Sequence, residues 1–221
     1  MKPNWIKAAI LAAFTLAAAG AQAGVTVNDS TYGAFDRSSG TRTYSVGTHG
    51  TVTDVNFTID FSKCDDPAIG QTGTACIGQG ASFPTEIGFQ LTSATGQTIN
   101  LVNPGTYTSG AGRFTVTFDD EAGSAVGTAL ASGAYRPVEG LDAFDGFDMF
   151  GTWTLTIRDT TGADPLEYFS SSLMINGGGT DGGNGGGGNG GGTGVPEPAT
   201  AAILGLGLIG MRAARRRKSS N

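Results

Sequence analysis

The sequence predicts an all-β chain whose central part folds as an antiparallel sandwich between two short terminal signals. Three observations carry this prediction. Apolar residues alternate with polar ones in several segments, Gly, Ser and Thr punctuate the segments as turns, and both ends pair an apolar run with basic residues. Period-two alternation is typical of half-buried strands, and several such strands at turn-punctuated spacing favour a sandwich.

The N-terminus has the features of a secretory signal peptide over residues 1–23. Lys2 and Lys7 precede the apolar run "AAILAAFTLAAAGAQA", which ends in a small-x-small pattern. Such a segment is removed on export, so we expect signal peptidase to cut after Ala23. The alternative, an N-terminal anchor, is disfavoured because the run is shorter than the ~20 residues of a comfortable span.

Residues 24–176 are expected to form the folded domain. Its apolar residues repeat at every second position within 55–61, 87–91, 114–118 and 153–157. The stretch "SATGQT" between two of these segments has turn chemistry and predicts a hairpin. Trp153 shares the parity of the apolar positions in its segment, so it is expected in the core rather than in a ligand platform.

The predicted mature part of the chain is strongly acidic. Residues 24–194 contain six basic and eighteen acidic residues, a net charge of −12. A surface of this kind repels phosphate backbones and attracts divalent cations, so a nucleic-acid partner is not expected.

Two cysteines, Cys64 and Cys76, stand in "CDDPAIGQTGTAC". An even cysteine count in an exported chain predicts one disulfide. The alternative, a metal site, would need further Cys or His ligands, and His49 is the only histidine.

Two groups of acidic residues fall in Gly-rich stretches and are candidates for a calcium site. Calcium takes six to eight oxygen ligands from carboxylates, backbone carbonyls and water. The alternative is that these carboxylates are solvated loop charges, and the spacing is not that of an EF-hand. We expect Arg136, next to both groups, to pair with one of them. The candidate calcium ligands are Asp119, Asp120, Glu121, Asp142, Asp145 and Asp148.

The sequence offers little for catalysis. A serine-protease triad needs a base beside the nucleophile, and the one candidate base, His49, lies in a Gly-flanked turn without any Gly-x-Ser-x-Gly motif. A glycosidase carboxylate pair would be expected together with aromatic platforms, but the aromatic residues fall mostly at core parities. We therefore expect no enzyme and no catalytic residue.

The last 45 residues contain a linker and a sorting signal. Residues 177–194 hold thirteen glycines in eighteen positions, a composition that predicts a disordered linker. Residues 195–221 resemble a PEP-CTERM signal: a Pro-Glu-Pro triplet, an apolar run long enough for a short transmembrane helix, and a basic tail. The residues matching this pattern for exosortase recognition are Val195, Pro196, Glu197, Pro198, Arg215, Arg216 and Arg217.

Four segments of the domain resemble the P domain of proprotein convertases, also called P/Homo B, whose fold is a jelly-roll-like β-sandwich. They are "VTDVNFTIDF" (52–61), read as the opening strand, "LTSATGQTINLV" (91–102), "FTVTFDDEAG" (114–123) and "YRPVEGLDAFDGFDMFGTWTLTIRD" (135–159). The chain departs from the family at Thr85-Glu86-Ile87-Gly88, where relatives carry Gly-Asp-Leu, and at Phe169, where relatives carry Trp. Some bacterial members bind calcium in loops, which supports a calcium cofactor here by resemblance.

Together these features lead to a functional expectation. The chain is an exported, exosortase-processed, non-catalytic module with an adhesion, structural or binding role at the cell surface or in the extracellular matrix. Signal peptidase, exosortase and, transiently, the inner membrane are its partners during export, and an exopolysaccharide or a surface protein is its partner afterwards. Two alternatives stay open: an accessory P domain that docks on a separate subtilisin-like protease, and a carbohydrate-binding module.

Overall fold

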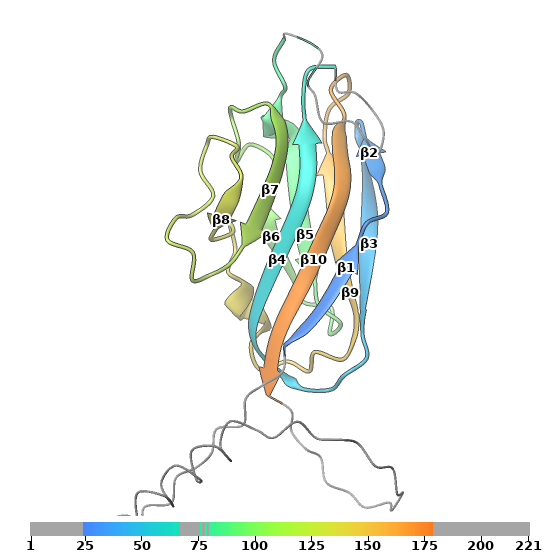
Figure 1. Cartoon of the computed structure of the whole chain (residues 1–221), viewed down its shortest axis with the longest axis vertical. Helices are drawn as coiled ribbons and strands as arrows, with labels where there is room; N and C mark the ends of the chain where they lie inside the picture. Colours follow the sequence, from blue (N-terminus) through green and yellow to red (C-terminus); the bar gives the residue numbers. More distant parts are fainter. Residues whose placement is uncertain (1–23, 67–75, 77, 79, 179–221) are drawn as a thin grey trace, which may run out of the picture. The chain divides into compact units, whose positions relative to one another are not determined.

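The computed structural model describes residues 24–66, 76, 78 and 80–178, which all belong to one compact unit. Two sheets face each other and form a sandwich (Figure 1). The first sheet contains β1 (Val25–Asp29), β2 (Gly33–Phe35), β4 (Thr51–Lys63), β7 (Gly112–Phe118), β8 (Gly133–Tyr135) and β10 (Leu166–Gly178). The second contains β3 (Ser38–Val46), β5 (Ile87–Thr92), β6 (Thr98–Val102) and β9 (Gly151–Asp159), and two 3₁₀ turns, η1 (Pro84–Glu86) and η2 (Leu141–Phe144), lie in the connections.

The strand order explains which loops meet. The first sheet runs β1-β10-β4-β7-β8 with β2 also paired to β10, and the second runs β3-β9-β5-β6. Every pairing is antiparallel except the short one between β7 and β8. The predicted antiparallel sandwich is therefore confirmed.

At the top of Figure 1, β4 and β9 end and β10 begins, and we call this the Lys63 end. At the bottom β4 begins and β10 ends, and we call this the Asp145 end.

The alternating residues form the core, as their spacing predicts. Val55, Phe57, Ile59 and Phe61 of β4 are all at most 1 % exposed. They meet the inward residues of β5 and β9, among them the fully buried Trp153, whose indole nitrogen donates to the Met149 carbonyl at 3.0 Å. Burying aromatic side chains of this size is the main source of stability in such a domain. The core role predicted for Trp153 is confirmed.

The predicted hairpin joins β5 to β6. Thr92 pairs with Thr98, and the Ser93 amide donates to the Gln97 carbonyl across the turn. Gly96 has φ of 91°, a left-handed conformation that residues with a side chain rarely adopt.

Three strands precede the segment that the resemblance places first. In β3 the first two inward positions are Gly40 and Arg42, so the apolar alternation is limited to Tyr44 and Val46 and is too short to reveal the strand. Gly40 faces Phe35, whose ring leaves no room for a Cβ atom at this position. Arg42 pairs with Asp29 at 3.2 Å and lies over the Tyr168 ring at 4.6 Å. These partners replace the hydrophobic contacts that a sequence pattern would have signalled.

The last strand is longer than the sequence indicates. β10 pairs with β4 up to Gly177 and Gly178, so the first two residues assigned to the Gly-rich linker belong to the sheet. A bulge between Tyr168 and Ser170 shifts the register, so that the alternation of side chains between the two faces is interrupted there. The Phe169 ring packs against the Arg113 guanidinium, with 3.8 Å between the ring centroid and Arg113 Cζ.

Several predicted features lie outside the described residues: the signal peptide with its cleavage site at Ala23, the remainder of the linker, and the tail from Val195 onward with its short apolar helix. Within the described residues, no helix has the length and apolar character needed to cross a membrane.

Candidate binding surface

The two predicted acidic groups come together at the Asp145 end. The amide of Asp142 donates to the Asp120 carboxylate at 2.7 Å, which joins the loop after β7 to η2. Burial and then the nearby charges of Asp142, Asp54 and Asp120 raise the pKa of Asp145. Asp54 of β4 thus belongs to this group, although its position in an alternating strand did not predict this.

Glu121 lies at the exposed margin of the same group. A hydrogen bond with Asp119 is the main cause that raises the pKa of its carboxyl, and Asp54 adds to the effect. The Asp119 carboxylate also accepts the Glu121 amide at 2.8 Å. These carboxylates are therefore mutually repulsive groups on an exposed surface.

The Asp148 carboxylate bonds to residues outside this acidic group. Its carboxylate accepts the Phe150 amide at 3.1 Å and the Gly50 amide at 3.2 Å, and it contacts His49 Nδ1 at 2.7 Å. These hydrogen bonds, with the one to His49 the largest, lower the pKa of Asp148 to about 2. The His49 ring stacks on Phe150 with centroids 4.1 Å apart, so the pair fixes the turn between β3 and β4.

Among the residues that the structure describes, no three Asp, Glu, His or Cys side chains are arranged to hold a metal ion. The calcium site therefore stays a prediction. Arg136 does not pair with a carboxylate in the described part of the chain; its guanidinium donates to the Ala122 carbonyl at 2.5 Å. It holds the loop between β7 and β8 through this backbone contact, in place of the predicted pairing with one of the acidic groups.

Cys64 and Cys76 form the predicted disulfide, with Cα atoms 5.0 Å apart. The bridge follows directly after β4 and closes a loop at the Lys63 end. It leaves no free cysteine in the described part of the chain.

A polar depression with a volume of about 280 Å³ lies on the outer face of the first sheet. It extends across β1, β10, β4 and β7. We call it the hydroxyl depression, because most of its lining residues carry hydroxyl groups. They are Asn28, Asp29, Ser30, Thr58, Asp60, Thr115, Ser170, Ser171 and Ser172.

The floor of the hydroxyl depression is fixed from inside the sandwich. Ser171 Oγ lies 2.5 Å from the hydroxyls of both Tyr44 and Tyr168, and Tyr168 also donates to Asp29 at 2.9 Å. Burial raises the pKa of Tyr44 to about 12 and raises that of Tyr168 as well, so both hydroxyls stay protonated donors. A buried, satisfied network of this kind holds its members in one geometry.

One wall is held by a charged pair. Arg113 donates to both carboxylate oxygens of Asp60, at 2.8 and 2.7 Å, and lies over the Phe169 ring. The Asp60 charge is therefore neutralised locally. A bidentate pair fixes the orientation of both side chains more firmly than a single contact would.

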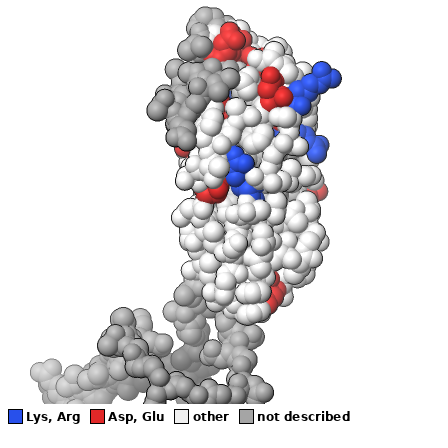
Figure 2. Space-filling model, turned by 90° about the vertical axis from the view of Figure 1, so that its right-hand side faces the viewer, with Lys and Arg blue, Asp and Glu red and all other residues white. Residues whose placement is uncertain are grey.

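The outer face of the second sheet is also polar and almost uncharged. The strand register places four threonines in one row across the four strands: Thr43, Thr154, Thr92 and Thr98. A smaller depression of about 70 Å³ lies near its end, lined in part by Gln90, Asn100 and Arg158. Figure 2 shows that, on the side carrying β1 to β3, charged side chains gather toward the Lys63 end and leave most of the remaining surface neutral.

Sequence reasoning missed both faces because it used the alternation only to find the core. The positions between the core residues are also informative. Ser, Thr and Asn occupy most of these outward-facing positions, and few of them are charged. Because residues 24–194 carry a net charge of −12, the scarcity of charged residues on the strand faces is informative. Only the register, however, places Ser170, Asp60 and Thr115 in one row.

Comparison with known proteins identifies the C-terminal signal. Residues 194–218 match the PEP-CTERM protein-sorting motif, which confirms the predicted resemblance there and implies exosortase-dependent export and processing. No curated protein matches the chain.

Among solved structures, the chain is similar to a chain of the Aeromonas sobria serine protease in complex with the chaperone, at 13% identity and a TM-score of 0.37. That similarity covers 71% of this chain and 28% of the other. The serine protease of Aeromonas sobria itself gives 14% identity and a TM-score of 0.34, with 69% and 27% covered. The chain thus spans less than a third of each of these two structures.

Proposed function

We propose that the mature domain is a non-catalytic binding module of the cell surface or extracellular matrix, and that its ligand is a neutral polysaccharide. The hydroxyl depression is the observation that carries this proposal. Its size suits part of a sugar chain, and its side chains offer hydroxyl and amide groups that both donate and accept hydrogen bonds. Sugar hydroxyls have the same dual character.

The charge distribution supports a neutral ligand. The domain carries a large negative charge that repels anionic polymers, yet Asp60 in the depression is paired with Arg113. A neutral polymer that binds there would displace surface water and would not need to neutralise the domain. Exosortase-dependent export delivers such a module to the envelope, where polysaccharide is available.

Aromatic stacking is not part of this proposal. Phe169, which precedes Ser170 of the depression, is 8 % exposed and lies under Arg113, and the rings of Tyr44 and Tyr168 beneath Ser171 are fully buried. Binding would then depend on hydrogen bonds alone, each contributing about 1 kcal/mol net. We infer that single-site affinity is low and that retention in a matrix depends on many copies binding one polymer.

His49 bears on the non-catalytic part of the proposal, because a triad would need a nucleophile at its second ring nitrogen. Its Nδ1 contacts Asp148 and its ring stacks on Phe150 in an exposed turn, and no hydroxyl or thiol of the described residues hydrogen-bonds its Nε2. We expect no peptidase activity from the purified protein, and His49→Ala should leave its binding to polysaccharide unchanged. Peptide cleavage that is lost in this variant would contradict the assignment.

The test compares two matched double variants for binding to purified exopolysaccharide by affinity electrophoresis. Thr115→Val with Ser172→Ala removes two hydroxyls from the depression, and we expect binding weaker by roughly tenfold or more. Thr43→Val with Thr154→Val removes two hydroxyls from a registered pair on the opposite face and should have no effect.

Equal loss in both variants, or no loss in either, would contradict the placement of the site. Binding to a secreted subtilisin-like protease without any binding to polysaccharide would instead favour the accessory-domain alternative.

A further inference from the structure

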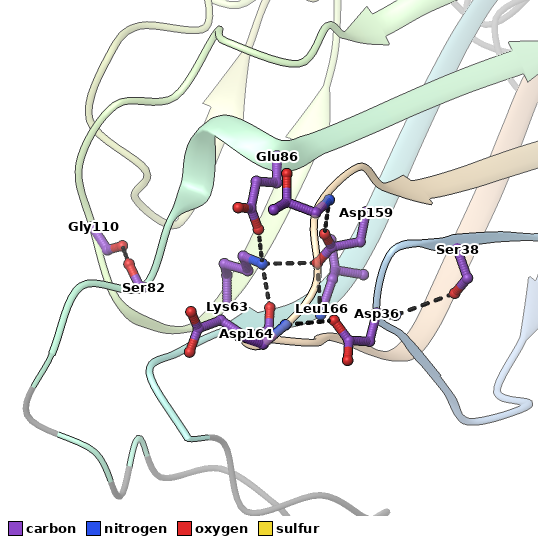
Figure 3. Close-up of polar contacts among 11 residues, drawn as sticks. Asp36, Ser38, Lys63, Ser82, Glu86, Gly110, Asp159, Asp164 and Leu166 are labelled. Atoms are coloured by element: carbon purple, nitrogen blue, oxygen red, sulfur yellow. Dashed lines mark hydrogen bonds and ion pairs between the residues drawn. The ribbon is translucent and has the colours of Figure 1, made fainter.

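A buried lysine lies between two carboxylates at the Lys63 end (Figure 3). Lys63 Nζ is 2.7 Å from Asp159 Oδ2 and 2.9 Å from Glu86 Oε2, and it also donates to the Asp164 carbonyl. The side chains of Lys63 and Asp159 are both 0 % exposed, and that of Glu86 is 11 % exposed. The three residues come from β4, η1 and the end of β9, so they join the two sheets.

The charge of this group is unusual for a buried ion pair. One ammonium between two carboxylates leaves one negative charge in excess, and a low-dielectric interior disfavours such an excess. Burial is the first cause that raises the pKa of Asp159, although Lys63 opposes it. Moving one proton from the ammonium to Asp159 leaves the Lys63 amine facing a carboxylic acid, and the remaining negative charge then stays on Glu86 at the margin of the group.

The Asp159 carboxyl is held for attack. The Thr161 amide donates to Oδ1 at 3.2 Å, and the Leu166 amide donates to Oδ2 at 3.1 Å. Backbone N–H groups aimed at a carboxyl oxygen stabilise the negative charge that develops there in acyl transfer. The fixed contact between Nζ and the carboxyl supplies the proximity that an amide-forming reaction needs.

We propose that Lys63 and Asp159 condense into an intramolecular amide that links the two sheets, with Glu86 transferring the proton. The Lys63 amine attacks Asp159 Cγ, so the Nζ–Cγ bond forms while Oδ1 takes up charge beside the Thr161 amide. Glu86 accepts a proton from Nζ and delivers it to the protonated Oδ2. The Cγ–Oδ2 bond then breaks and one water leaves. No oxidant, metal or cofactor is needed.

The link would complement the neighbouring disulfide. Cys64 follows Lys63 directly, so both cross-links would anchor the end of β4, one within a local loop and the other across the sandwich. An amide survives reductants that open the disulfide. A module at the cell surface would then keep its two sheets joined under reduction or mechanical load.

The test is the mass of the exported full chain after reduction and complete denaturation. The wild-type chain is expected to be lighter than its mature sequence by one water, and proteolysis should release the Lys63 and Asp159 peptides as one branched species. An unmodified wild-type mass after prolonged incubation would overturn the proposal, whatever the variants do.

Three variants separate this chemistry from a structural role. Glu86→Gln keeps the shape but cannot transfer the proton, so it should retain its full mass. Asp159→Asn should lose ammonia in place of water, a change that no ordinary ion pair would cause. Asp164→Asn is the control, because Asp164 contributes its backbone carbonyl, and it should lose water like the wild type. Loss of water from Glu86→Gln at the wild-type rate would overturn the role of Glu86.

Discussion

The two ends of the sandwich use carboxylates in opposite ways. At the Lys63 end, Glu86 and Asp159 are buried and share one ammonium. At the Asp145 end, Asp145 and its neighbours are exposed and repel one another. The difference teaches that the same residue type can hold two sheets together or mark a surface open to cations, depending on burial and on the available counter-charge.

The largest effect is expected from Lys63→Met. It leaves two buried carboxylates without a cation, which costs about 3–5 kcal/mol. For a domain of this size the melting temperature should fall by roughly ten degrees. Urea unfolding at neutral pH measures the loss in the free energy of unfolding, and thermal unfolding measures the change in melting temperature. The matched control is Arg113→Met, which breaks a partly exposed pair and should cost about 1 kcal/mol. Equal losses would mean that burial does not distinguish the two cations.

Opening the disulfide should have the next largest effect. A loop with a sequence separation of 12 corresponds to about 3 kcal/mol on the chain-entropy model. Cys64→Ser with Cys76→Ser should lower stability by this amount in denaturant unfolding. Reductant should destabilise the wild type and leave the double variant unchanged, and a response in the double variant would show that reductant acts elsewhere.

Calcium tests the Asp145 end. If the carboxylates there bind Ca²⁺, a concentration ten times the dissociation constant should stabilise the domain by about 1.4 kcal/mol, and a chelator should reverse this. Thermal unfolding with Ca²⁺ or chelator measures it. Asp120→Asn should abolish the response, whereas Asp36→Asn, before β3, should preserve it. A melting temperature unchanged by chelator and by excess calcium would remove the calcium prediction.

The smallest effect concerns repulsion at the same end without calcium. The pKa of Asp145 is raised in the folded state, so its ionised form weakens folding at neutral pH and this cost disappears as pH falls below about 4. Asp145→Asn should therefore stabilise the domain by a few tenths of a kcal/mol at pH 7 and not at pH 3.

Asp148→Asn provides the opposite sign for this comparison. The pKa of Asp148 is lowered from 3.8 to about 2, so its contribution is present above pH 4 and is lost as pH falls toward 2. Neutralising it should weaken the domain at pH 7. If both variants changed stability in the same direction at pH 7, the prediction that ionised Asp145 destabilises the domain and ionised Asp148 stabilises it would be contradicted.

Much of the fold follows from local sequence. The alternations in β4, β5, β7 and β9 and the turn at Gly96 lie within a few residues of one another, so a periodic pattern is enough to detect them. β3 could not be found in this way, because Arg42 and Gly40 take inward positions that only Asp29, Tyr168 and Phe35 make favourable.

The candidate sites were less predictable. The sequence identified acidic loops, but the structure joins Asp54 to them and commits Asp148 to His49. The hydroxyl depression needed the register of four strands. Glu86 appeared only as a departure from a family pattern, and nothing in its neighbourhood indicated that it would face Lys63.

The sequence by itself determined the export route and the sandwich, because sorting signals and strand periodicity are written in consecutive residues. Only the tertiary structure decided which charges are neutralised and which polar groups share a face. Those properties depend on distances between residues far apart in the chain, such as Lys63 and Asp159, and the core packing that brings them together also removes the water that would otherwise screen them.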